Sequence, residues 1–417
     1  EGSKHPIGLE AVEITETKAE AITEDAPVTK IVATILRHAT EQRASDIHIE
    51  SLAEKTRVRF RIDGILQTNI TLPSKVHSAV VARIKVLSNM RLDEKRKPQD
   101  GRFSARVSGN KVDFRVSTFP TYYGEKVVMR IFDPESTVKD LSALGFAAHD
   151  AQRWEGLTKQ PHGIVLVTGP TGSGKTTTLY ATLKRLATEE VNVSTVEDPI
   201  EMIEPAFNQT QVQPHLDLDF AQGLRSLMRQ DPDIIMVGEV RDLATAEMAV
   251  QAALTGHLVF TTLHTNDAPS AIMRLMELGI PPYLINATVL GVLAQRLVRT
   301  LCPACRKPQD KDEAAASRAA LAELVRPWQV SGSYRPYQPV GCVDCRMTGF
   351  RGRMGLYELL TVTEAFKDKV SREPVLDALR RQAVQDGMRP LRLGGAARVA
   401  EGQTTMDEVL ACTPPVQ

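Results

Sequence analysis

Hydrophobic and polar positions change their period along the chain, and the first part combines helical with strand-like spacing. Apolar residues in 31–39 recur at intervals of three and four, which predicts an amphipathic helix. Apolar and arginine residues alternate in Arg57–Ile62, which is typical of a half-buried strand. Residues 103–107 and 112–116 alternate in the same way on either side of a Ser-Gly-Asn turn, which predicts a β-hairpin. We therefore expect a small α+β domain in this part of the chain.

The second part contains short, continuously apolar runs separated by helical patterns. The runs are Ile164–Thr168, Val193–Val196, Ile234–Val237 and Leu258–Thr262. Apolar strands that alternate with helices are typical of a parallel sheet covered on both faces, so we expect an α/β core. After Thr300 this pattern gives way to Cys-, Pro- and Gly-rich sequence, and short helices are expected from about Thr361.

These changes of pattern predict the domain organisation. The expected segments are a linker arm at 1–26, an α+β domain at 27–133, an interdomain linker at 134–140, an α/β core at 141–300, a tetracysteine element at 301–360 and a helical subdomain at 361–417.

Composition indicates an ordinary globular protein and argues against nucleic-acid-binding and membrane-spanning proteins. The chain has 417 residues, of which 42% are hydrophobic and 24% charged, as in an ordinary globular protein. Lys+Arg and Asp+Glu both number 51, so the chain lacks the overall positive charge of many nucleic-acid-binding proteins. No apolar run approaches the roughly 20 residues that cross a bilayer. We therefore expect no bound nucleic acid and no direct membrane insertion.

A phosphate-binding loop follows the first apolar run of the core. The segment has the pattern G-x-x-x-x-G-K-[ST], in which backbone N–H groups wrap phosphate oxygens and the lysine reaches the β- and γ-phosphates. Thr176 offers a hydroxyl to Mg²⁺, and the following helix directs its N-terminus at the anion. We therefore expect ATP to be bound by Gly169, Pro170, Thr171, Gly172, Ser173, Gly174, Lys175, Thr176 and Thr177.

Carboxylates end two of the other apolar strands. Glu239 follows Ile234–Val237 and is the candidate for the acid that holds Mg²⁺ or polarises water, although a strand end that returns to solvent has the same appearance. Val193–Val196 is followed by Glu197, Asp198 and Glu201, and ligands of open α/β sheets bind at such strand ends. Glu197 is a candidate general base, but spacing alone does not separate it from Asp198 or Glu201. His264, at a third strand end, is a candidate residue to contact the γ-phosphate or to transmit its loss, although most isolated histidines are ordinary core or surface residues.

The cysteines indicate a structural metal site. Cys302, Cys305, Cys342 and Cys345 form two Cys-x-x-Cys pairs, which supply the four thiolates of a tetrahedral Zn²⁺ site. Four cysteine ligands leave no open position, so a catalytic zinc is not expected. The alternative is a set of four reduced cysteines without metal.

Four blocks together resemble the hexameric secretion and pilus ATPases. Gly169–Thr176, Thr195–Glu201, Arg229–Asp242 and Leu254–Asn266 look like that family's Walker A, Asp box, Walker B and His box, and the similarity extends to Ser45–Glu50 and Pro98–Arg102. The tetracysteine element and the run Gln295–Cys302 look most like the type II secretion ATPase (general secretory pathway protein E), with the pilus-extension ATPase as the near alternative.

This resemblance implies properties that the residues alone do not. It implies a PAS-like first domain, a RecA-like P-loop core and a ring of six copies, with Glu197 as the base and Glu239 as the Walker B acid. It also implies that five arginines act on the nucleotide, although a solvated strand or helix face is the alternative for each. These are Arg102, Arg115 and Arg130 in the first domain, and Arg225 and Arg229 in the core.

The resemblance implies a function as well. We expect a cytoplasmic ATPase that uses ATP, Mg²⁺ and structural Zn²⁺ to power pseudopilus assembly in type II secretion. The resemblance also implies an N-terminal domain that docks on inner-membrane secretion platform proteins. We expect this domain to be missing here, because the chain begins Glu1-Gly2-Ser3 without a methionine. Two alternatives from other classes are a RecA-like nucleic-acid motor, which DNA-stimulated ATPase activity would reveal, and a non-hydrolysing nucleotide-binding scaffold.

Overall fold

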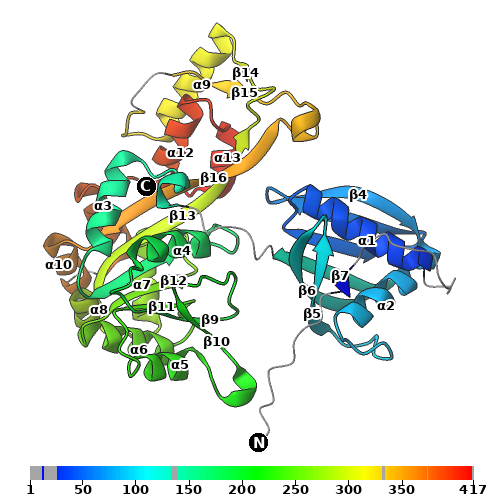
Figure 1. Ribbon diagram of the computed structural model, residues 1–417. Coiled ribbons are helices and arrows are strands. Elements are labelled where there is room, and N and C mark those ends of the chain that lie inside the picture. The colour runs from blue at the N-terminus through cyan, green and yellow to red at the C-terminus, as the bar shows by residue number, and fades with distance from the viewer. Residues whose placement is uncertain (1–11, 14–25, 133–139, 331–333, 373, 416–417) are drawn as a thin grey trace, which may run out of the picture. The chain divides into compact units, whose positions relative to one another are not determined.

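The computed structural model describes residues 12–13, 26–132, 140–330, 334–372 and 374–415. The chain divides into two compact units, 1–137 and 138–417, and each is described by itself (Figure 1). Almost all of the arm expected at 1–26 lies outside the described residues, as does all of the linker expected at 134–140 except Asp140. Within the described residues, no helix has both the length and the apolar character that crossing a bilayer requires.

The first unit is a sheet with two helices packed on one face. Its strands lie in the order β1-β5-β6-β7-β2-β3-β4. Ile35 and Leu36 of α1 and Ile84 of α2 share one buried core with strand residues such as Phe60 and Phe114. The elements are β1 (Val12–Glu13), α1 (Ala26–Glu41), β2 (Asp46–Ser51), β3 (Lys55–Ile62), β4 (Ile65–Pro73), α2 (His77–Leu87), β5 (Gln99–Val107), β6 (Asn110–Thr121) and β7 (Gly124–Phe132).

The local predictions for this unit are confirmed. The expected helix lies within α1, and β5 pairs with β6 as an antiparallel hairpin in which Phe103 faces Phe114. The chain turns through Ser108 and Gly109, whose φ angles of 51° and 91° lie in the left-handed region that glycine adopts without strain. On the opposite face, Arg102, Arg115 and Arg130 stand side by side on three neighbouring strands.

The second unit is built on a mixed sheet in the order β10-β9-β11-β12-β8-β13-β16. All neighbours are parallel except β13 and β16, which are antiparallel. The strands are β8 (Gly163–Thr168), β9 (Val193–Glu197), β10 (Asn208–Gln211), β11 (Ile234–Val237), β12 (Leu258–Leu263), β13 (Val289–Leu301) and β16 (Phe350–Thr361). The four apolar runs identified in the sequence are therefore adjacent parallel strands, and β16, which falls within the expected tetracysteine element, extends their sheet.

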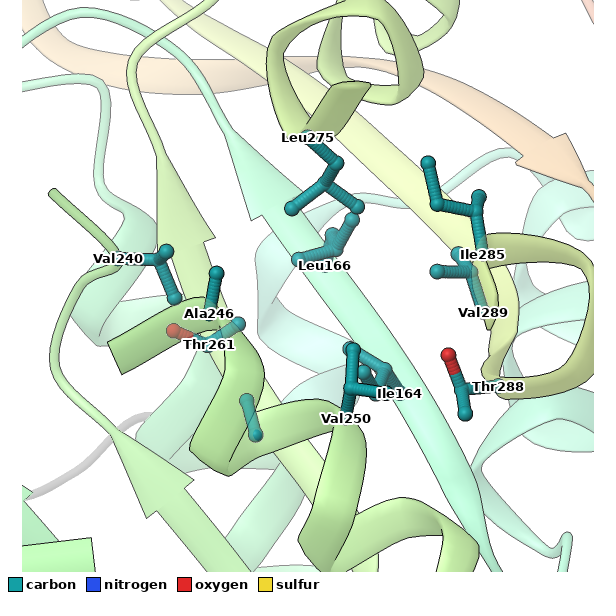
Figure 2. A pocket seen from close by; sticks show the side chains of 11 residues that line it. Ile164, Leu166, Val240, Ala246, Val250, Thr261, Leu275, Ile285, Thr288 and Val289 are labelled. Atoms are coloured by element: carbon teal, nitrogen blue, oxygen red, sulfur yellow. The ribbon is translucent and has the colours of Figure 1, made fainter. Parts of the chain in front are cut away.

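Helices cover both faces of this sheet. Ile164 and Leu166 of β8 point into a core shared with α5 (Phe220–Leu227), α6 (Leu243–Leu254), α7 (Ala268–Glu277) and α8 (Pro282–Thr288). Val165 and Val167 point into a second core with α3 (Ala148–Thr158) and α4 (Lys175–Leu186). The first core retains a small apolar pocket between β8, α6, α7 and α8 (Figure 2).

The remaining helices follow β13 in the sequence. They are α9 (Lys311–Leu324), α10 (Glu364–Arg372), α11 (Leu376–Gln385), α12 (Leu391–Ala400) and α13 (Met406–Cys412), and two short strands, β14 (Lys307–Pro308) and β15 (Tyr337–Gln338), pair beside α9 (Figure 1). Phe366, Leu379, Val399 and Val409 join these helices to the first core of the sheet. The C-terminal helices are thus part of the same compact unit as the sheet.

Candidate active site

The sheet topology brings the chemically interesting residues to one edge. Strands β9, β11, β12 and β8 are parallel neighbours, so their carboxyl ends lie at the same edge of the sheet. Glu197 ends β9, Glu239 follows β11 and His264 follows β12. The phosphate loop follows β8. Residues that are far apart in the sequence are therefore collected where ligands of open α/β sheets bind.

The phosphate loop has a backbone that its glycines make possible. Gly169, Gly172 and Gly174 have φ angles of 151°, 79° and 87°. A side chain at Gly169 would place Cβ 2.6 Å from both the carbonyl of Gln295 and the hydroxyl of Ser173, so the close approach also requires glycine there. Helix α4 begins at Lys175, and Gly174 provides no side-chain cap. The first N–H groups of the helix are therefore available to an anion.

Lys175 lies in the loop with its ammonium group directed at backbone carbonyls. Its Nζ donates to Gly169 O at 2.8 Å and to Pro170 O at 3.2 Å. Burial lowers the pKa of Lys175 to about 8, with Glu239 acting in the opposite direction and Arg296 lowering it further. A bound phosphate would supply the negative charge that this partly desolvated ammonium lacks.

Gln295, on the neighbouring strand β13, donates a hydrogen bond to the backbone of the phosphate loop. Its side-chain Nε2 donates to Ser173 O at 2.6 Å, and its side chain is 1% exposed. In the sequence, Gln295 stood out only as part of a family-like run, and this role was not predicted. A signal was present, because a polar residue within the apolar strand Val289–Leu301 must find hydrogen-bond partners when it is buried.

Glu239 and His264 meet at the sheet edge. His264 Nε2 lies 3.3 Å from one carboxylate oxygen of Glu239, and Arg241 lies 2.5 Å from the other. Burial alone would raise the pKa of Glu239, but the hydrogen bond and charge of Arg241, together with His264, lower it below its usual value. Because the charge of Glu239 also acts on Lys175, these side chains form one electrostatic cluster. An ionised carboxylate in this position can hold a hard divalent cation.

Glu197 is more enclosed than its neighbours on the same segment. It is 3% exposed, and its carboxylate accepts hydrogen bonds from Tyr180 at 2.6 Å, Thr195 at 2.7 Å and Gln209 at 3.1 Å. The Asp198 side chain is 41% exposed, 3.7 Å from Arg241. These three bonds leave a lone pair of the carboxylate free, but water must reach a side chain that is almost fully buried, so the assignment of Glu197 as the base stays a prediction.

The five arginines are divided between the two units. Arg225 Nη1 donates to Gln222 on α5, and Arg229 donates to the Arg225 carbonyl at 3.0 Å. In the first unit, Arg130 pairs with Asp46 at 3.1 Å and Arg115 stacks over Phe132. The expectation that these residues and Arg102 reach a nucleotide stays a prediction.

The four cysteines expected to bind zinc come together. Their sulfurs lie within 4.8 Å of one another, with separations of 3.9 Å for Cys302–Cys342 and 3.7 Å for both Cys305–Cys345 and Cys342–Cys345. Sulfurs placed tetrahedrally at about 2.3 Å from zinc lie roughly 3.8 Å apart, so the cluster has the size of a zinc site.

Backbone donors favour the thiolate form that a metal requires. The N–H groups of Cys342 and Gly349 donate to Cys345 Sγ at 3.1 and 3.2 Å. Burial alone would raise the pKa of Cys345, but these donors and the neighbouring thiols lower it. A backbone hydrogen bond with Cys345 acts to lower the pKa of Cys342, but burial and the neighbouring thiols raise it. The donor set therefore fits Zn²⁺ in size and ligand type, with Cys345 as the thiol that ionises most readily.

Known proteins resemble the chain over most of its length. A family model described as "Type II/IV secretion system protein" matches residues 21–411. A type IV pilus assembly ATPase, TfpB of Acinetobacter baylyi, is 53% identical over 391 residues, which are 94% of this chain and 66% of that protein. The type II secretion system ATPase E of Vibrio cholerae is 46% identical over 390 residues, covering 94% of this chain and 76% of that protein.

A solved structure resembles the fold across both units. The pilus retraction motor PilT with bound ADP aligns with a TM-score of 0.61 and 25% sequence identity, covering 92% of this chain and 96% of that one.

Proposed function

Since this chain belongs to the type II/IV secretion system protein family, we propose that its ATPase activity powers assembly of the type II secretion pseudopilus, and with it protein export across the outer membrane. The observation that carries this proposal is the convergence of the phosphate loop, Glu239 and His264 at one sheet edge, with the charge of Glu239 acting on Lys175. A nucleotide bound by the loop would present its γ-phosphate to these side chains.

We assign roles to the residues of this edge. Mg²⁺, when bound, would be held by the Thr176 hydroxyl and Glu239 and would neutralise charge on the phosphates. Lys175 stabilises the charge that develops as water attacks the γ-phosphate in line. Glu197 orients or deprotonates that water, and His264 contacts the γ-phosphate. The loss of the γ-phosphate then changes the contacts of the loop that carries His264.

Several finer assignments belong to the same proposal. The first unit is PAS-like and the second is RecA-like, six copies form a ring, and the five arginines Arg102, Arg115, Arg130, Arg225 and Arg229 complete the nucleotide site. Zn²⁺ held by the cysteines is structural. The protein works in the cytoplasm, at inner-membrane platform proteins. Sedimentation velocity with and without a non-hydrolysable ATP analogue tests the ring, because a chain that stays monomeric with the analogue contradicts it.

A second candidate function is type IV pilus assembly. The observation that favours it is the 53% identity to a type IV pilus assembly ATPase. The two candidate functions can be separated by introducing Lys175→Ala into the chromosomal gene for this protein in its native organism. Loss of exoprotein secretion with normal pili supports the type II secretion role. Loss of pili with normal secretion supports pilus assembly instead, and normal secretion together with normal pili contradicts both.

A further inference from the structure

Arg296, next to Gln295 on β13, is a buried arginine whose hydrogen bonds go to its own strand and to two distant segments of the chain. It is 6% exposed. Its Nη1 donates to Gln295 O at 3.0 Å, its Nη2 donates to Asn266 O at 2.8 Å and Oδ1 at 3.3 Å, and its Nε donates to Cys412 O at 3.0 Å. A planar guanidinium can hold several acceptors in fixed directions at once, which an ammonium group cannot.

Two of these segments belong to the nucleotide site. The Gln295 carbonyl is the atom that a side chain at Gly169 would approach to 2.6 Å, so it lies directly against the phosphate loop. Asn266 lies two residues beyond His264, in the loop between β12 and α7. That loop is also hydrogen-bonded to β8, because the Thr265 N–H donates to the Thr168 hydroxyl at 2.9 Å. Arg296 therefore connects the base of the phosphate loop with the loop that carries His264.

The third segment is the end of the C-terminal helix α13. The Cys412 carbonyl is one of the last carbonyls of this helix, and such carbonyls lack partners within the helix. Arg296 satisfies it across 116 residues of chain. A single side chain thus joins the nucleotide edge of the sheet to the C-terminal helices.

The electrostatic setting of Arg296 favours a role at the phosphates. The hydrogen bonds described above go to neutral oxygens, and burial lowers the pKa of the guanidinium while Cys412, Glu358 and Asp267 act to raise it. Its charge also acts on Lys175. Arg296 is therefore coupled electrostatically to the phosphate loop.

We propose that Arg296 is a positioning residue for ATP hydrolysis, which holds the His264 loop in place against the phosphate loop and links both to the end of α13. The inference rests on hydrolysis at the phosphate loop. Arg296 acts through Asn266 and the Gln295 carbonyl, and does not itself touch the nucleotide. Its loss shifts the side chains that meet the γ-phosphate more than those that hold the rest of the nucleotide.

Arg392 on α12 provides a matched control. It is a buried arginine, 8% exposed, that also holds the end of α13, with its Nη2 donating to Thr413 O at 2.7 Å and its Nε to the Thr413 hydroxyl at 3.3 Å. Its hydrogen bonds reach neither Asn266 nor Gln295. Replacing either arginine by Met removes a buried guanidinium that anchors the same helix end, but only Arg296→Met also releases the His264 loop.

The experiment compares steady-state phosphate release and mant-ADP binding for the wild-type chain, Arg296→Met, Arg296→Lys and Arg392→Met. We expect Arg296→Met to lower kcat by about 10- to 100-fold, because small misplacements of reacting groups have effects of this size. We expect KM and the Kd of mant-ADP to change by less than about threefold, which is the signature of an interaction made mainly in the transition state. Arg296→Lys should recover part of kcat, and Arg392→Met should stay within about threefold of wild type.

A double-mutant cycle separates positioning from general stability. If Arg296 acts through the His264 loop, Arg296→Met should lower kcat in a His264→Ala background by less than about threefold. Equal losses of kcat in Arg296→Met and Arg392→Met, or full additivity with His264→Ala, would overturn the proposal. If Arg296→Met does not fold, a folded Arg296→Lys with wild-type kcat overturns it too. If the wild-type chain releases no more phosphate than Lys175→Ala, the proposed function itself fails, and the inference with it.

Discussion

The side-chain amide of Gln295 donates to the backbone carbonyl of Ser173 at 2.6 Å, across 122 residues of chain. This bond fixes the phosphate loop to strand β13, whose other end leads into the tetracysteine element at Cys302. The geometry of the loop therefore depends on a strand that lies far from it in the sequence. The strand also carries Arg296, so the same element supports both the phosphate loop and the His264 loop.

Changes at Gln295 should weaken nucleotide binding in a defined order. Gln295→Met removes the donor and leaves the buried Ser173 carbonyl unpaired, which costs about 1–3 kcal/mol, or roughly 5- to 160-fold in Kd if the loop must be rebuilt on binding. Gln295→Glu should weaken mant-ADP binding further, because it places an acceptor against that carbonyl. Fluorescence titration of both variants measures the effect. Wild-type affinity in Gln295→Glu would show that the bond does not shape the loop.

Substitution of the carboxylates after β9 should identify the base. We expect Glu197→Gln to lower kcat by at least about 100-fold with mant-ADP affinity retained, because the loss of a general base has effects of this size. Asp198→Asn and Glu201→Gln serve as matched controls and should stay within about threefold of wild type. The measurement is steady-state phosphate release at saturating ATP. A larger loss in either control than in Glu197→Gln would move the role to that residue.

The tetracysteine cluster should contain one zinc ion per chain. Cys305→Ser should lower the zinc content measured by atomic emission and reduce the thermal unfolding midpoint, because a structural zinc site contributes directly to folding stability. Cys412→Ser is the control and should keep the zinc, since Cys412 is a separate cysteine on α13. A metal-free wild-type protein after purification without chelators would contradict this prediction.

Glu358 should make the stability of the second unit depend on pH. It is buried on β16 and accepts hydrogen bonds from the N–H groups of Ala268 at 2.8 Å and Leu391 at 3.1 Å. Burial, together with Asp267, raises its pKa from 4.5 to about 7, although both N–H donors and Arg296 act to lower it. Between these two values the folded protein keeps a proton that the unfolded chain has lost. The free energy of unfolding therefore falls as pH rises through this window, and the contribution of Glu358 is fully present below pH 4.5.

The contribution of Glu358 to the free energy of unfolding should fall by about 3 kcal/mol between pH 4.5 and pH 7. The measurement compares urea unfolding of the wild type and Glu358→Gln at several pH values. The fluorescence of Trp154 and Trp328 reports on the second unit, which contains both tryptophans. Because Gln does not titrate, the advantage of the wild type over the variant should shrink as pH rises. A difference in unfolding free energy between the wild type and Glu358→Gln that stays constant with pH would show that Glu358 is ionised throughout this range.

Features encoded by local patterns were predictable from the sequence. Helix α1, the β5–β6 hairpin and the four adjacent parallel strands of the core follow from hydrophobic period and turn residues alone. The phosphate loop, Glu239 and His264 were expected at strand ends, and parallel strands bring such ends to one edge. The family resemblance drawn from four motif blocks is confirmed by the family match.

Contacts that depend on tertiary packing were not predictable. Glu197 was identified as a candidate base, but its enclosure by Tyr180 and Gln209 depends on how α4 and β10 pack beside β9. Strand β16 was included in the tetracysteine element because the sequence after Thr300 was interpreted as Cys-, Pro- and Gly-rich up to the helices expected from about Thr361. Its antiparallel pairing with β13 is a long-range contact that no local pattern encodes.

We propose that this chain hydrolyses ATP at the phosphate loop, and that the nucleotide site becomes complete only when the copies of the proposed ring assemble. The most direct test is steady-state phosphate release per chain as a function of protein concentration, with Lys175→Ala as the blank. We expect specific activity to rise steeply with concentration and to vanish in Lys175→Ala. Activity that is abolished by Lys175→Ala but independent of concentration would contradict the shared site, and no release above the blank at any concentration would contradict hydrolysis itself.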